Sequence, residues 1–357
     1  MSIDIFSIGT IFSFGVAVGV SWLLLATQHL HGRLSLDFTD GPQKFHCDPT
    51  PRIGGAAIFF ALVIGSYFSP DPVSHLLGSM LIASLPAFAA GFTEDITKRV
   101  SVFKRLFATF ISALLASFLT GYTLSHLSVW GLDALLLYLP ISVLFTAFAV
   151  AGVANAVNII DGFNGLASGS VIIAIAAMGV IALEVGDFTL FTLSLTVLTG
   201  IGGFMLFNFP FGKMFMGDGG AYLLGFLLAW IAVMLPARNP EVSEWASLLA
   251  CAYPINETIF TMTRRSLRKD SLGLPDSAHL HSLIKITIVR RYFRELQPWM
   301  RNSLVAPFCW VYAASFAVAG VVLYKQTALL MVAWAVSFLV YALLYILLSR
   351  SHGVILK

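Results

Sequence analysis

The feature that most constrains this chain is a series of long apolar runs. Stretches of about 16 to 22 apolar residues recur along it, and about 20 are needed for a helix to cross the hydrocarbon core of a bilayer. Only 11% of the 357 residues are charged, whereas soluble domains carry about 25%. The sequence therefore predicts an all-α polytopic membrane protein with about eleven transmembrane helices. The predicted spans are 5–26, 53–69, 74–92, 106–121, 134–154, 166–184, 188–208, 220–236, 246–263, 302–323 and 327–348.

Lysine and arginine are distributed unevenly among the connecting segments, and such a bias predicts orientation because cytoplasmic loops are enriched in both. With the N-terminus placed in the periplasm, the 21 lysine and arginine residues all fall on the cytoplasmic side except Arg238 and Lys325. An odd number of spans then leaves the C-terminus in the cytoplasm. We expect one integral membrane domain over 1–357, with a long cytoplasmic loop at 264–301 that contains a basic amphipathic segment.

Amides and one carboxylate separate two of the predicted spans. Asn155, Asn158 and Asp161 are spaced three apart, which places them on one face of a helix, and Gly162 and Gly165 follow as turn residues. Polar groups at a membrane helix end are costly unless they bind something. We therefore expect a binding or catalytic site here, at the cytoplasmic face.

Two acidic segments are expected at the same face. Glu94 and Asp95 end one span, where the helix dipole disfavours carboxylates, so that either nearby cations or a divalent metal should compensate them. A solvated loop of mixed charge is the alternative. Asp218, in a Met-Gly-Asp-Gly-Gly segment, offers a hard oxygen ligand for Mg²⁺ or Mn²⁺ and also suits the N-cap of the next helix. The glycines around it would allow tight backbone packing.

Basic groups complete this cytoplasmic set. Arg52, at the start of the second span, suits a phosphate oxygen, and Gly54-Gly55 would let the backbone approach a ligand. An ordinary juxtamembrane arginine is the alternative. His279 and His281 are better explained as donors to phosphate than as a metal pair, because neither HExxH spacing nor a thiolate accompanies them.

Glu257 lies inside the ninth predicted span, where an acid is expensive and is usually functional or paired. Arg264 and Arg265 are its candidate partners. The chain has no P-loop and no GxGxxG motif, which excludes nucleotide-binding domains of those kinds. Hard acids beside basic groups at a membrane surface are what phosphoryl transfer to a membrane-bound anion requires.

Five segments, in this order, resemble the polyprenyl-phosphate N-acetylhexosamine-1-phosphate transferase superfamily, of the glycosyltransferase family 4 type. They are HCDPTPRIGG, GFTED, NAVNIIDGFNG, FMGDGGAYLLG and HLH, and the similarity runs from about His46 to Arg294. The resemblance implies a multi-pass protein of the bacterial inner membrane. It also implies Mg²⁺-dependent transfer of a sugar 1-phosphate from a UDP-N-acetylhexosamine to undecaprenyl phosphate, with release of UMP.

The resemblance also implies residue roles, position by position. Asp218 and Asn158 would hold the metal ion, which is Mg²⁺ or Mn²⁺. Asp95 and Asp161 would be the catalytic carboxylates, with Glu94 beside them. Asn164 would contact the uracil. The remaining substrate-binding residues would be Arg52, Lys104, Asn155, His279 and His281.

Departures from the family pattern bear on these roles. Glu94 stands where the family often has aspartate, and Asn164 stands where many members carry a second aspartate. An amide there can still read uracil but cannot act as a base. The PTPRIGG and HLH segments are unlike the peptidoglycan translocase branch. They favour the branch that initiates O-antigen or common-antigen glycans, as in lipopolysaccharide biosynthesis.

Two other functions compete with this interpretation. A secondary transporter with a cytoplasm-facing acidic site is the main alternative, but transporters usually hold their ionisable groups at the bilayer midplane, between internal repeats that this sequence lacks. An alcohol phosphotransferase that uses CDP-lipids would need a multi-aspartate helix motif, which is missing. We expect no nucleic acid among the partners. The donor sugar, the polyprenyl length and assembly as a homodimer stay open.

Overall fold

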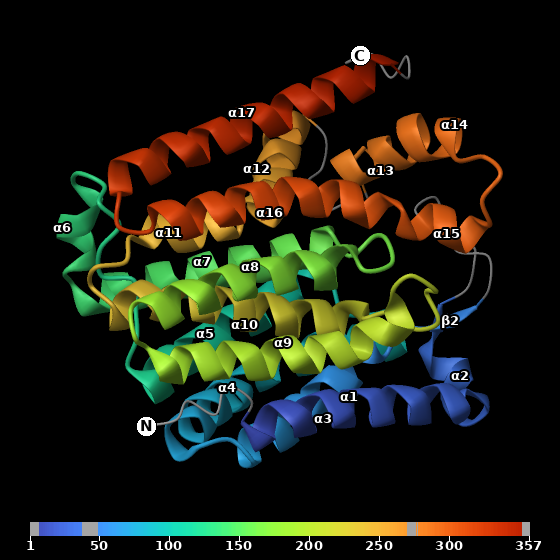
Figure 1. The fold of residues 1–357 in the computed structure, drawn as a ribbon, viewed down its shortest axis with the longest axis horizontal. Helices are drawn as coiled ribbons and strands as arrows, with labels where there is room; N and C mark the ends of the chain where they lie inside the picture. The colour runs from blue at the N-terminus through green and yellow to red at the C-terminus, as the bar shows by residue number, and fades with distance from the viewer. Residues whose placement is uncertain (1–6, 38–48, 270–275, 277, 352–357) are drawn as a thin grey trace.

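The computed structural model describes residues 7–37, 49–269, 276 and 278–351, and this part of the chain is almost wholly helical (Figure 1). Its two short strands, β1 (Leu36–Asp37) and β2 (Thr50–Pro51), pair antiparallel and join the two sides of the first long loop. The helices are α1 (Ile8–Ala26), α2 (Gln28–Ser35), α3 (Gly54–Tyr67), α4 (Asp71–Thr97), α5 (Val102–Thr120), α6 (Leu132–Leu136), α7 (Leu139–Ile159), α8 (Leu166–Glu184), α9 (Phe188–Asn208), α10 (Gly217–Arg238), α11 (Glu244–Ala250), α12 (Ala252–Leu267), α13 (Leu280–Ile284), the π-helical η1 (Lys285–Val289), α14 (Arg290–Tyr292), α15 (Pro298–Ser303), α16 (Val305–Leu323) and α17 (Thr327–Ser351).

Nine helical segments in the described residues are long and apolar enough to cross a membrane: α1, α4, α5, α7, α8, α9, α10, the continuous α15–α16 segment and α17. The all-helical polytopic prediction is thereby confirmed, and the predicted number of eleven spans is corrected. The predicted span 53–69 forms α3, whose 14 residues reach only about 21 Å at 1.5 Å per residue. The periplasmic N-terminus and cytoplasmic C-terminus stay predictions.

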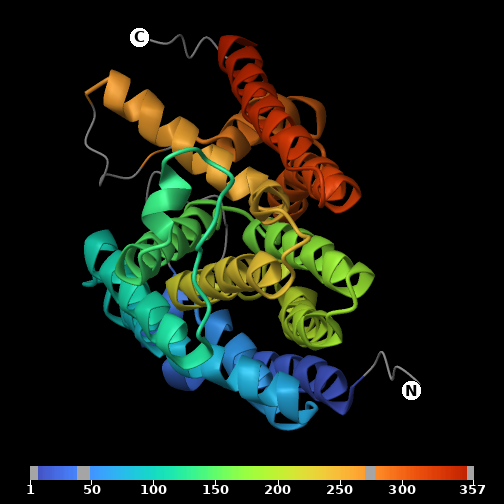
Figure 2. The same ribbon diagram turned by 90° about the vertical axis from the view of Figure 1, so that its left-hand side faces the viewer.

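The predicted span 246–263 is divided into α11 and α12, which meet at Cys251. Pro254 explains the break, since it has no N–H to donate to the carbonyl of Ala250 and its ring would clash with that carbonyl. The first turn of a new helix tolerates proline, and α12 places it there. After the break α12 turns away from the direction of its neighbours (Figures 1 and 2).

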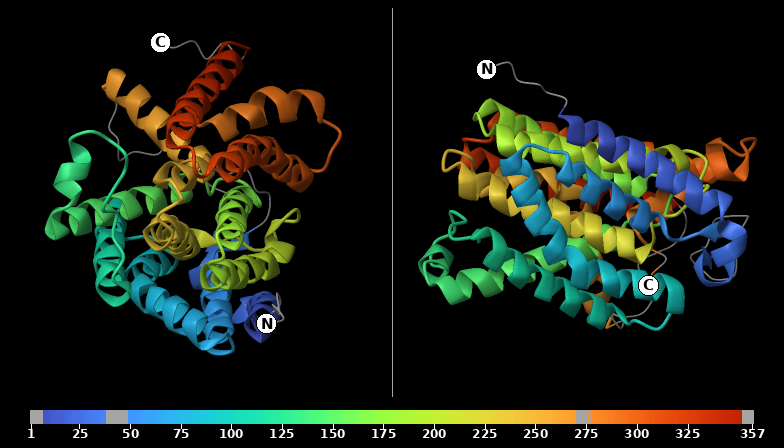
Figure 3. Two further views of the ribbon diagram at one scale, coloured as in Figure 1. Left: turned by 60° about the vertical axis from the view of Figure 1, so that its left-hand side comes forward. Right: turned by 90° about the horizontal axis from the view of Figure 1, so that it is seen from below.

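Helix α10 forms the centre of the molecule, with other helices on all sides of it (Figure 3, left). It packs against α3, α4, α5, α7, α8 and α11. Of its most apolar 18-residue stretch, 89% is buried inside the molecule. Leucine, alanine, glycine and aromatic side chains cover its whole circumference, which is the pattern of a helix that faces no solvent. Any group at either end of α10 is therefore held by several neighbouring helices.

The first turn of α10 touches two other helices through their main chains. A Cβ atom added to Gly55 of α3 would lie 2.3 Å from the Gly220 nitrogen, and one added to Gly91 of α4 would lie 2.6 Å from the Asp218 carbonyl carbon. Only glycine allows such an approach. The expected tight packing of the Gly-Asp-Gly-Gly segment is confirmed. The sequence suggested that a ligand approaches Gly55. In the structure the backbone of α10 occupies that place.

The opposite end of α10 carries Arg238, which is bonded to the loop between α8 and α9. Its Nε and Nη2 donate to the two carboxylate oxygens of Asp187 at 2.6 and 2.8 Å, and Nη1 donates to the Tyr122 hydroxyl at 2.8 Å. Burial opposes ionisation of Asp187, but the bonds from Arg238 and from the Leu190 amide outweigh it and hold the pKa of this carboxyl below its usual value. At this end of α10, Arg238 and Asp187 therefore form a bidentate ion pair.

Candidate active site

Asp218, in the first turn of α10, is the centre of a cluster of polar side chains. Its Oδ1 accepts hydrogen bonds from Arg52 Nη2 at 2.9 Å and from Asn158 Nδ2 at 3.0 Å, and its Oδ2 forms an ion pair with Arg105. These partners come from the segment just before α3, the end of α7 and the start of α5. The expected convergence of distant segments at one end of the helices is therefore present in the structure.

Asp95, near the end of α4, binds the backbone of the turn that carries Asp218. It is 1% exposed, and its two carboxylate oxygens accept hydrogen bonds from the backbone amides of Asp218 and Gly219, both at 2.8 Å. Arg52 Nε lies 3.3 Å from the same carboxylate. Gly217 makes the turn into α10 with a φ of +75°, and a Cβ there would strike both Arg52 and Asp95. Asp95 thus fixes the direction in which Asp218 leaves the backbone.

The end of α7 contributes two amides. Asn158 contacts Asp218, and Asn155 accepts a hydrogen bond from the Tyr222 hydroxyl at 3.2 Å. Asp161 was expected on the same helical face, but α7 ends at Ile159. Asp161 instead lies in the following turn, where its amide bonds to the Asn158 carbonyl at 3.3 Å.

The carboxyl of Asp161 is partly buried and has an unusual proton affinity. Burial raises its pKa to about 7, against an opposing effect of the nearby Arg52 guanidinium. Near neutral pH this group is therefore divided between its acid and its carboxylate. A carboxyl in that state can exchange a proton with a ligand.

Arg105 is a member of the cluster that the sequence analysis missed in favour of its neighbour Lys104. The Lys104 side chain is exposed, whereas Arg105 is 8% exposed and pairs with Asp218. The signal was present in the helical period, because Arg105 shares the buried face of α5 with Thr109 and Ser112 and Lys104 does not.

Two other predicted site residues, Glu94 and Asn164, form their hydrogen bonds with groups other than Asp218. Glu94 accepts a hydrogen bond from the Val100 amide at 2.6 Å and so closes the turn after α4. Asn164 is 7% exposed, and its amide nitrogen donates to the Pro210 carbonyl and to Ser303 Oγ, both at 3.3 Å. Asn164 thereby joins the loop after α7 to two other segments.

His279 and His281 form a second group with the buried Glu257 of α12. His279 Nδ1 lies 2.9 Å from one carboxylate oxygen of Glu257, and His281 Nδ1 lies 3.7 Å from the other. Arg264, one of the two partners that the sequence suggested for Glu257, pairs with Asp276 instead. The ring of His281 also packs edge-on against Phe163, two residues after Asp161, with ring centroids 5.7 Å apart.

The donor atoms around Asp218 suit a hard divalent cation. Asn158 uses its amide nitrogen on Asp218, which leaves its amide oxygen free to serve as a ligand next to the carboxylate. In the described residues no three His, Cys, Asp or Glu side chains are grouped as a metal cluster. Mg²⁺ needs no such cluster, because it is commonly held by one or two protein oxygens together with substrate phosphates and water.

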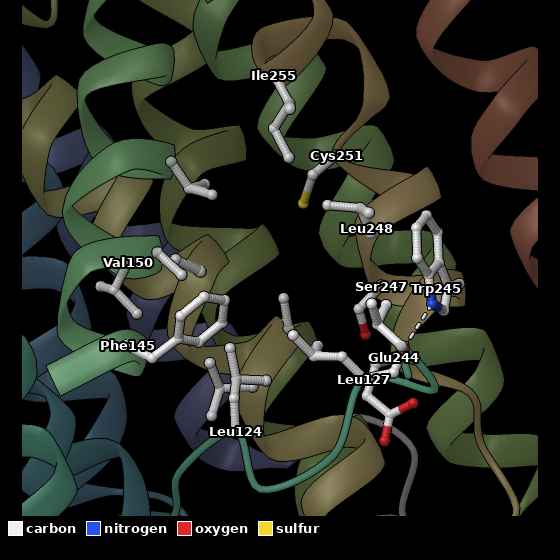
Figure 4. A pocket seen from close by; sticks show the side chains of 16 residues that line it. Leu124, Leu127, Phe145, Val150, Glu244, Trp245, Ser247, Leu248, Cys251 and Ile255 are labelled. Carbon is white, nitrogen blue, oxygen red and sulfur yellow. Dashed lines mark hydrogen bonds between the residues drawn. The ribbon is translucent and has the colours of Figure 1, made fainter. Parts of the chain in front are cut away.

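A cavity of about 320 Å³ lies between α7, α11, α12 and the second half of α10 (Figure 4). Its wall is almost entirely apolar, and Glu244 and Ser247 add polar atoms at one side. On α7 the lining extends from Phe145 to Val153. Val153 precedes Asn158 by five residues, or about 8 Å along a helix.

Comparisons with known proteins find relatives that share much of this chain. The glycosyl transferase family 4 model matches residues 77–236, a range that contains Asp95, Asn158, Asp161 and Asp218. A probable undecaprenyl-phosphate N-acetylglucosaminyl 1-phosphate transferase of Bacillus subtilis (strain 168) is 29% identical over 244 residues, which cover 67% of this chain and 66% of that relative.

Two further relatives differ in the sugar that their names specify. An undecaprenyl-phosphate alpha-N-acetylglucosaminyl 1-phosphate transferase of Yersinia pestis is 26% identical over 282 residues, or 76% of this chain and 75% of the relative. A phospho-N-acetylmuramoyl-pentapeptide-transferase of Streptococcus pneumoniae serotype 19F (strain G54) is 32% identical over 233 residues, or 62% of this chain and 68% of the relative. The match thus spans about two thirds or more of each of these three proteins. The chain belongs to glycosyl transferase family 4.

Proposed function

We propose that this protein transfers a sugar 1-phosphate from a UDP-N-acetylhexosamine to undecaprenyl phosphate, releasing UMP. The observation that carries the proposal is the meeting of Asp218, Arg52 and Arg105 at one end of α10. An acid flanked by two guanidinium groups suits a diphosphate, because the arginines can bind its oxygens and the acid can hold a metal against them. Family membership favours a transferase over the secondary transporter considered above.

In this proposal the chain holds the donor diphosphate in place for an in-line reaction. Arg52 and Arg105 bind its oxygens, while Asp218 and the amide oxygen of Asn158 hold Mg²⁺, or Mn²⁺ in its place. When bound, the metal polarises the phosphate oxygens and neutralises the charge that develops on them. Asp95 keeps the turn before Asp218 in position. His281, which packs against Phe163 in the Asp161 loop, and His279 beside it would face the sugar.

The reaction forms one bond and breaks one. An oxygen of the lipid phosphate attacks the sugar-linked phosphorus, and the bond from that phosphorus to the oxygen it shares with UMP breaks. Asp161, with a pKa near neutrality, is suited to take a proton from the attacking phosphate. If the reaction instead ran through a phosphorylated aspartate, incubation with labelled UDP-sugar alone would leave label on the denatured protein. We expect none.

The cavity beside α10 would take part of the isoprenoid chain, because its wall is apolar and it begins about 8 Å along α7 from Asn158. The change Ala229→Trp would fill it. We expect a higher KM for undecaprenyl phosphate and an unchanged KM for the UDP-sugar. A change in the KM for the UDP-sugar alone would argue against this placement.

We further propose that the site faces the cytoplasm of a bacterial inner membrane, supported by the distribution of lysine and arginine. The donor would be one used to initiate O-antigen, common-antigen or a related surface glycan. The N-acetylglucosaminyl relatives support this sugar class, and the muramoyl-pentapeptide relative makes the peptidoglycan precursor the donor to compare with it.

The experiment is an assay of UMP release by the purified protein with undecaprenyl phosphate and Mg²⁺. Its donors are UDP-GlcNAc, UDP-GalNAc, UDP-FucNAc, UDP-QuiNAc and UDP-MurNAc-pentapeptide, and its controls are EDTA and the variant Asp218→Asn. We expect release with one of the first four donors, abolished by both controls. Release with UDP-MurNAc-pentapeptide alone would reject the proposed branch. No release with any donor, together with no binding of UDP or UMP, would reject the reaction.

A further inference from the structure

Glu257 is a buried acid to which the proposed reaction assigns no part. Its exposed fraction is 0%, although it lies less than two turns after the break between α11 and α12. Oε1 accepts hydrogen bonds from Thr261 Oγ1 at 3.3 Å and from His279 Nδ1 at 2.9 Å, and Oε2 accepts one from the Leu280 amide at 3.2 Å. An acid so buried needs partners, and here two of its neighbours are imidazole rings.

The two imidazoles turn the same ring atom toward Glu257. Nδ1 of His279 is bonded to it, and Nδ1 of His281 lies 3.7 Å from Oε2 and 3.4 Å from the Tyr253 hydroxyl. The rings stack on each other with centroids 5.1 Å apart and planes 16° from parallel. The carboxylate therefore bonds the His279 ring directly and attracts the Nδ1 side of the His281 ring that stacks on it.

The other ring nitrogen of His281 faces the loop that carries Asp161. Its Nε2 lies 3.2 Å from the position that a Cβ on Gly162 would occupy. When Nδ1–H of an imidazole points to a carboxylate, Nε2 carries the lone pair of the neutral ring. Burial lowers the pKa of His281 to about 4 although Glu257 opposes the shift, so this ring is neutral at pH 7. With the proton on Nδ1, His281 Nε2 would accept a hydrogen bond, whereas a donor was expected from the sequence.

We propose that Glu257 is a positioning residue that holds His279 and His281 with Nδ1 inward, so that Nε2 of His281 is presented to the Asp161 loop as an acceptor for a substrate N–H or O–H group. This inference rests on the proposed sugar-phosphate transfer. The competing explanation is purely structural: Glu257 would join α12 to the start of α13 through the Leu280 amide, and the rings would be incidental.

The variant Glu257→Gln separates the two explanations because it keeps the shape of the side chain. A glutamine has one acceptor oxygen and one NH₂ group, so it cannot present an acceptor to both rings. The histidine that faces the NH₂ group should then change its tautomer. Asn256→Ala is the matched control. Asn256 is also buried in α12, but its amide donates to the Tyr312 hydroxyl at 2.7 Å and to Ser337 Oγ at 2.9 Å, away from the histidines.

Three measurements on these variants test the proposal. They are ¹⁵N spectra of histidine-labelled protein, with the two rings assigned through His279→Asn and His281→Asn, the kcat/KM of UMP release, and the thermal midpoint. We expect Nδ1-protonated rings in the wild type, and in Glu257→Gln one changed tautomer together with a roughly 10- to 100-fold lower kcat/KM, as for other residues that orient a functional histidine. Asn256→Ala should lower the thermal midpoint and leave the tautomers and kcat/KM unchanged.

A double-mutant cycle completes the test. If Glu257 acts through the rings, Glu257→Gln should cost much less activity in a His281→Asn background than in the wild type. Equal losses in both backgrounds, or unchanged histidine tautomers in Glu257→Gln, would overturn the proposal. If the wild type releases UMP from no donor, the proposed function fails, and the ¹⁵N spectra still decide whether Glu257 fixes the two rings.

Discussion

The two ends of α10 both carry ion pairs, yet they are built differently. At one end, Asp187 has one guanidinium partner, Arg238, which matches both of its oxygens, and the Leu190 and Asn239 amides add longer bonds to the same carboxylate. At the other end, Asp218 is shared between two guanidinium groups and an amide, and Arg52 also reaches Asp95. A matched pair stabilises a fold, whereas an acid with several competing partners can exchange one of them for a ligand. The comparison therefore separates a structural ion pair from a candidate site on the same helix.

The same substitution at both ends tests this separation most strongly. We expect Asp218→Asn to lower kcat for UMP release by at least roughly 10²-fold, because it removes a charge that acts on the reacting phosphates. Asp187→Asn should leave kcat unchanged but cost about 3 kcal/mol of stability, because it leaves Arg238 without its partner. Activity assays and thermal melts of both variants check this. The comparison fails if Asp187→Asn lowers kcat as far as Asp218→Asn does.

Substitutions of the adjacent residues Lys104 and Arg105, at the start of α5, test where the site ends. Arg105→Gln should reduce kcat/KM about 10- to 100-fold, the equivalent of losing one charge-assisted hydrogen bond of about 1.5–3 kcal/mol. Lys104→Gln removes the same charge from an exposed side chain and should change kcat/KM less than about threefold. Steady-state kinetics of both variants decide the matter, and equal losses would mean that net charge, and not the contact with Asp218, is what counts.

Asp161 should behave in the opposite way to Asp187 when its charge is removed. Its pKa is raised to about 7 in the folded protein, so above that pH the ionised carboxylate lowers the free energy of unfolding. The neutral amide of Asp161→Asn avoids this loss of stability. We expect the variant to be inactive yet to melt at a higher temperature than the wild type at pH 8 in EDTA. A lower melting temperature under these conditions would show that the carboxylate stabilises the fold.

Lowering the pH should reduce the stability that the Asp187–Arg238 ion pair contributes, and this effect should be smaller than those of the substitutions above. The pKa of this carboxyl is lowered in the folded protein, so its contribution is present above its ordinary value near 3.8 and is lost as the pH falls through the lowered pKa. Melting temperatures measured between pH 6 and pH 3 should therefore fall more steeply for the wild type than for Asp187→Asn. Parallel curves would mean that the pair adds no pH-dependent stability.

Much of the fold could be predicted because apolar length is a strong local signal. Each of the eleven predicted runs contains helix, and nine of the helical segments are long enough to span. The two exceptions came from details that a count of apolar residues ignores. Pro254 divides one run into two helices, and α3 is cut short at both ends, starting at Gly54 after the short strand β2 and ending at Tyr67.

The site was predictable in its members but not in its contacts. Helix ends on one side of a bundle must meet, which is why Asp218, Asn158 and Arg52 could be grouped from their positions alone. Which of two adjacent bases points inward depends on how α5 is rotated against its neighbours, and this distinguishes Arg105 from Lys104. The pairing of Asp187 with Arg238 joins residues 51 apart in the sequence, and no local pattern indicates it.

The glycine contacts at the start of α10 have a consequence for motion. Side chains in a protein interior change rotamer on fast timescales, and a functional group that rests on them inherits that movement. Where Gly55 meets Gly220 and Gly91 meets Asp218, main chain touches main chain and no rotamer intervenes. The backbone of Asp218 should therefore be held as rigidly as the three helices themselves, while its carboxylate and the Arg52 and Arg105 side chains that meet it keep their own rotamers.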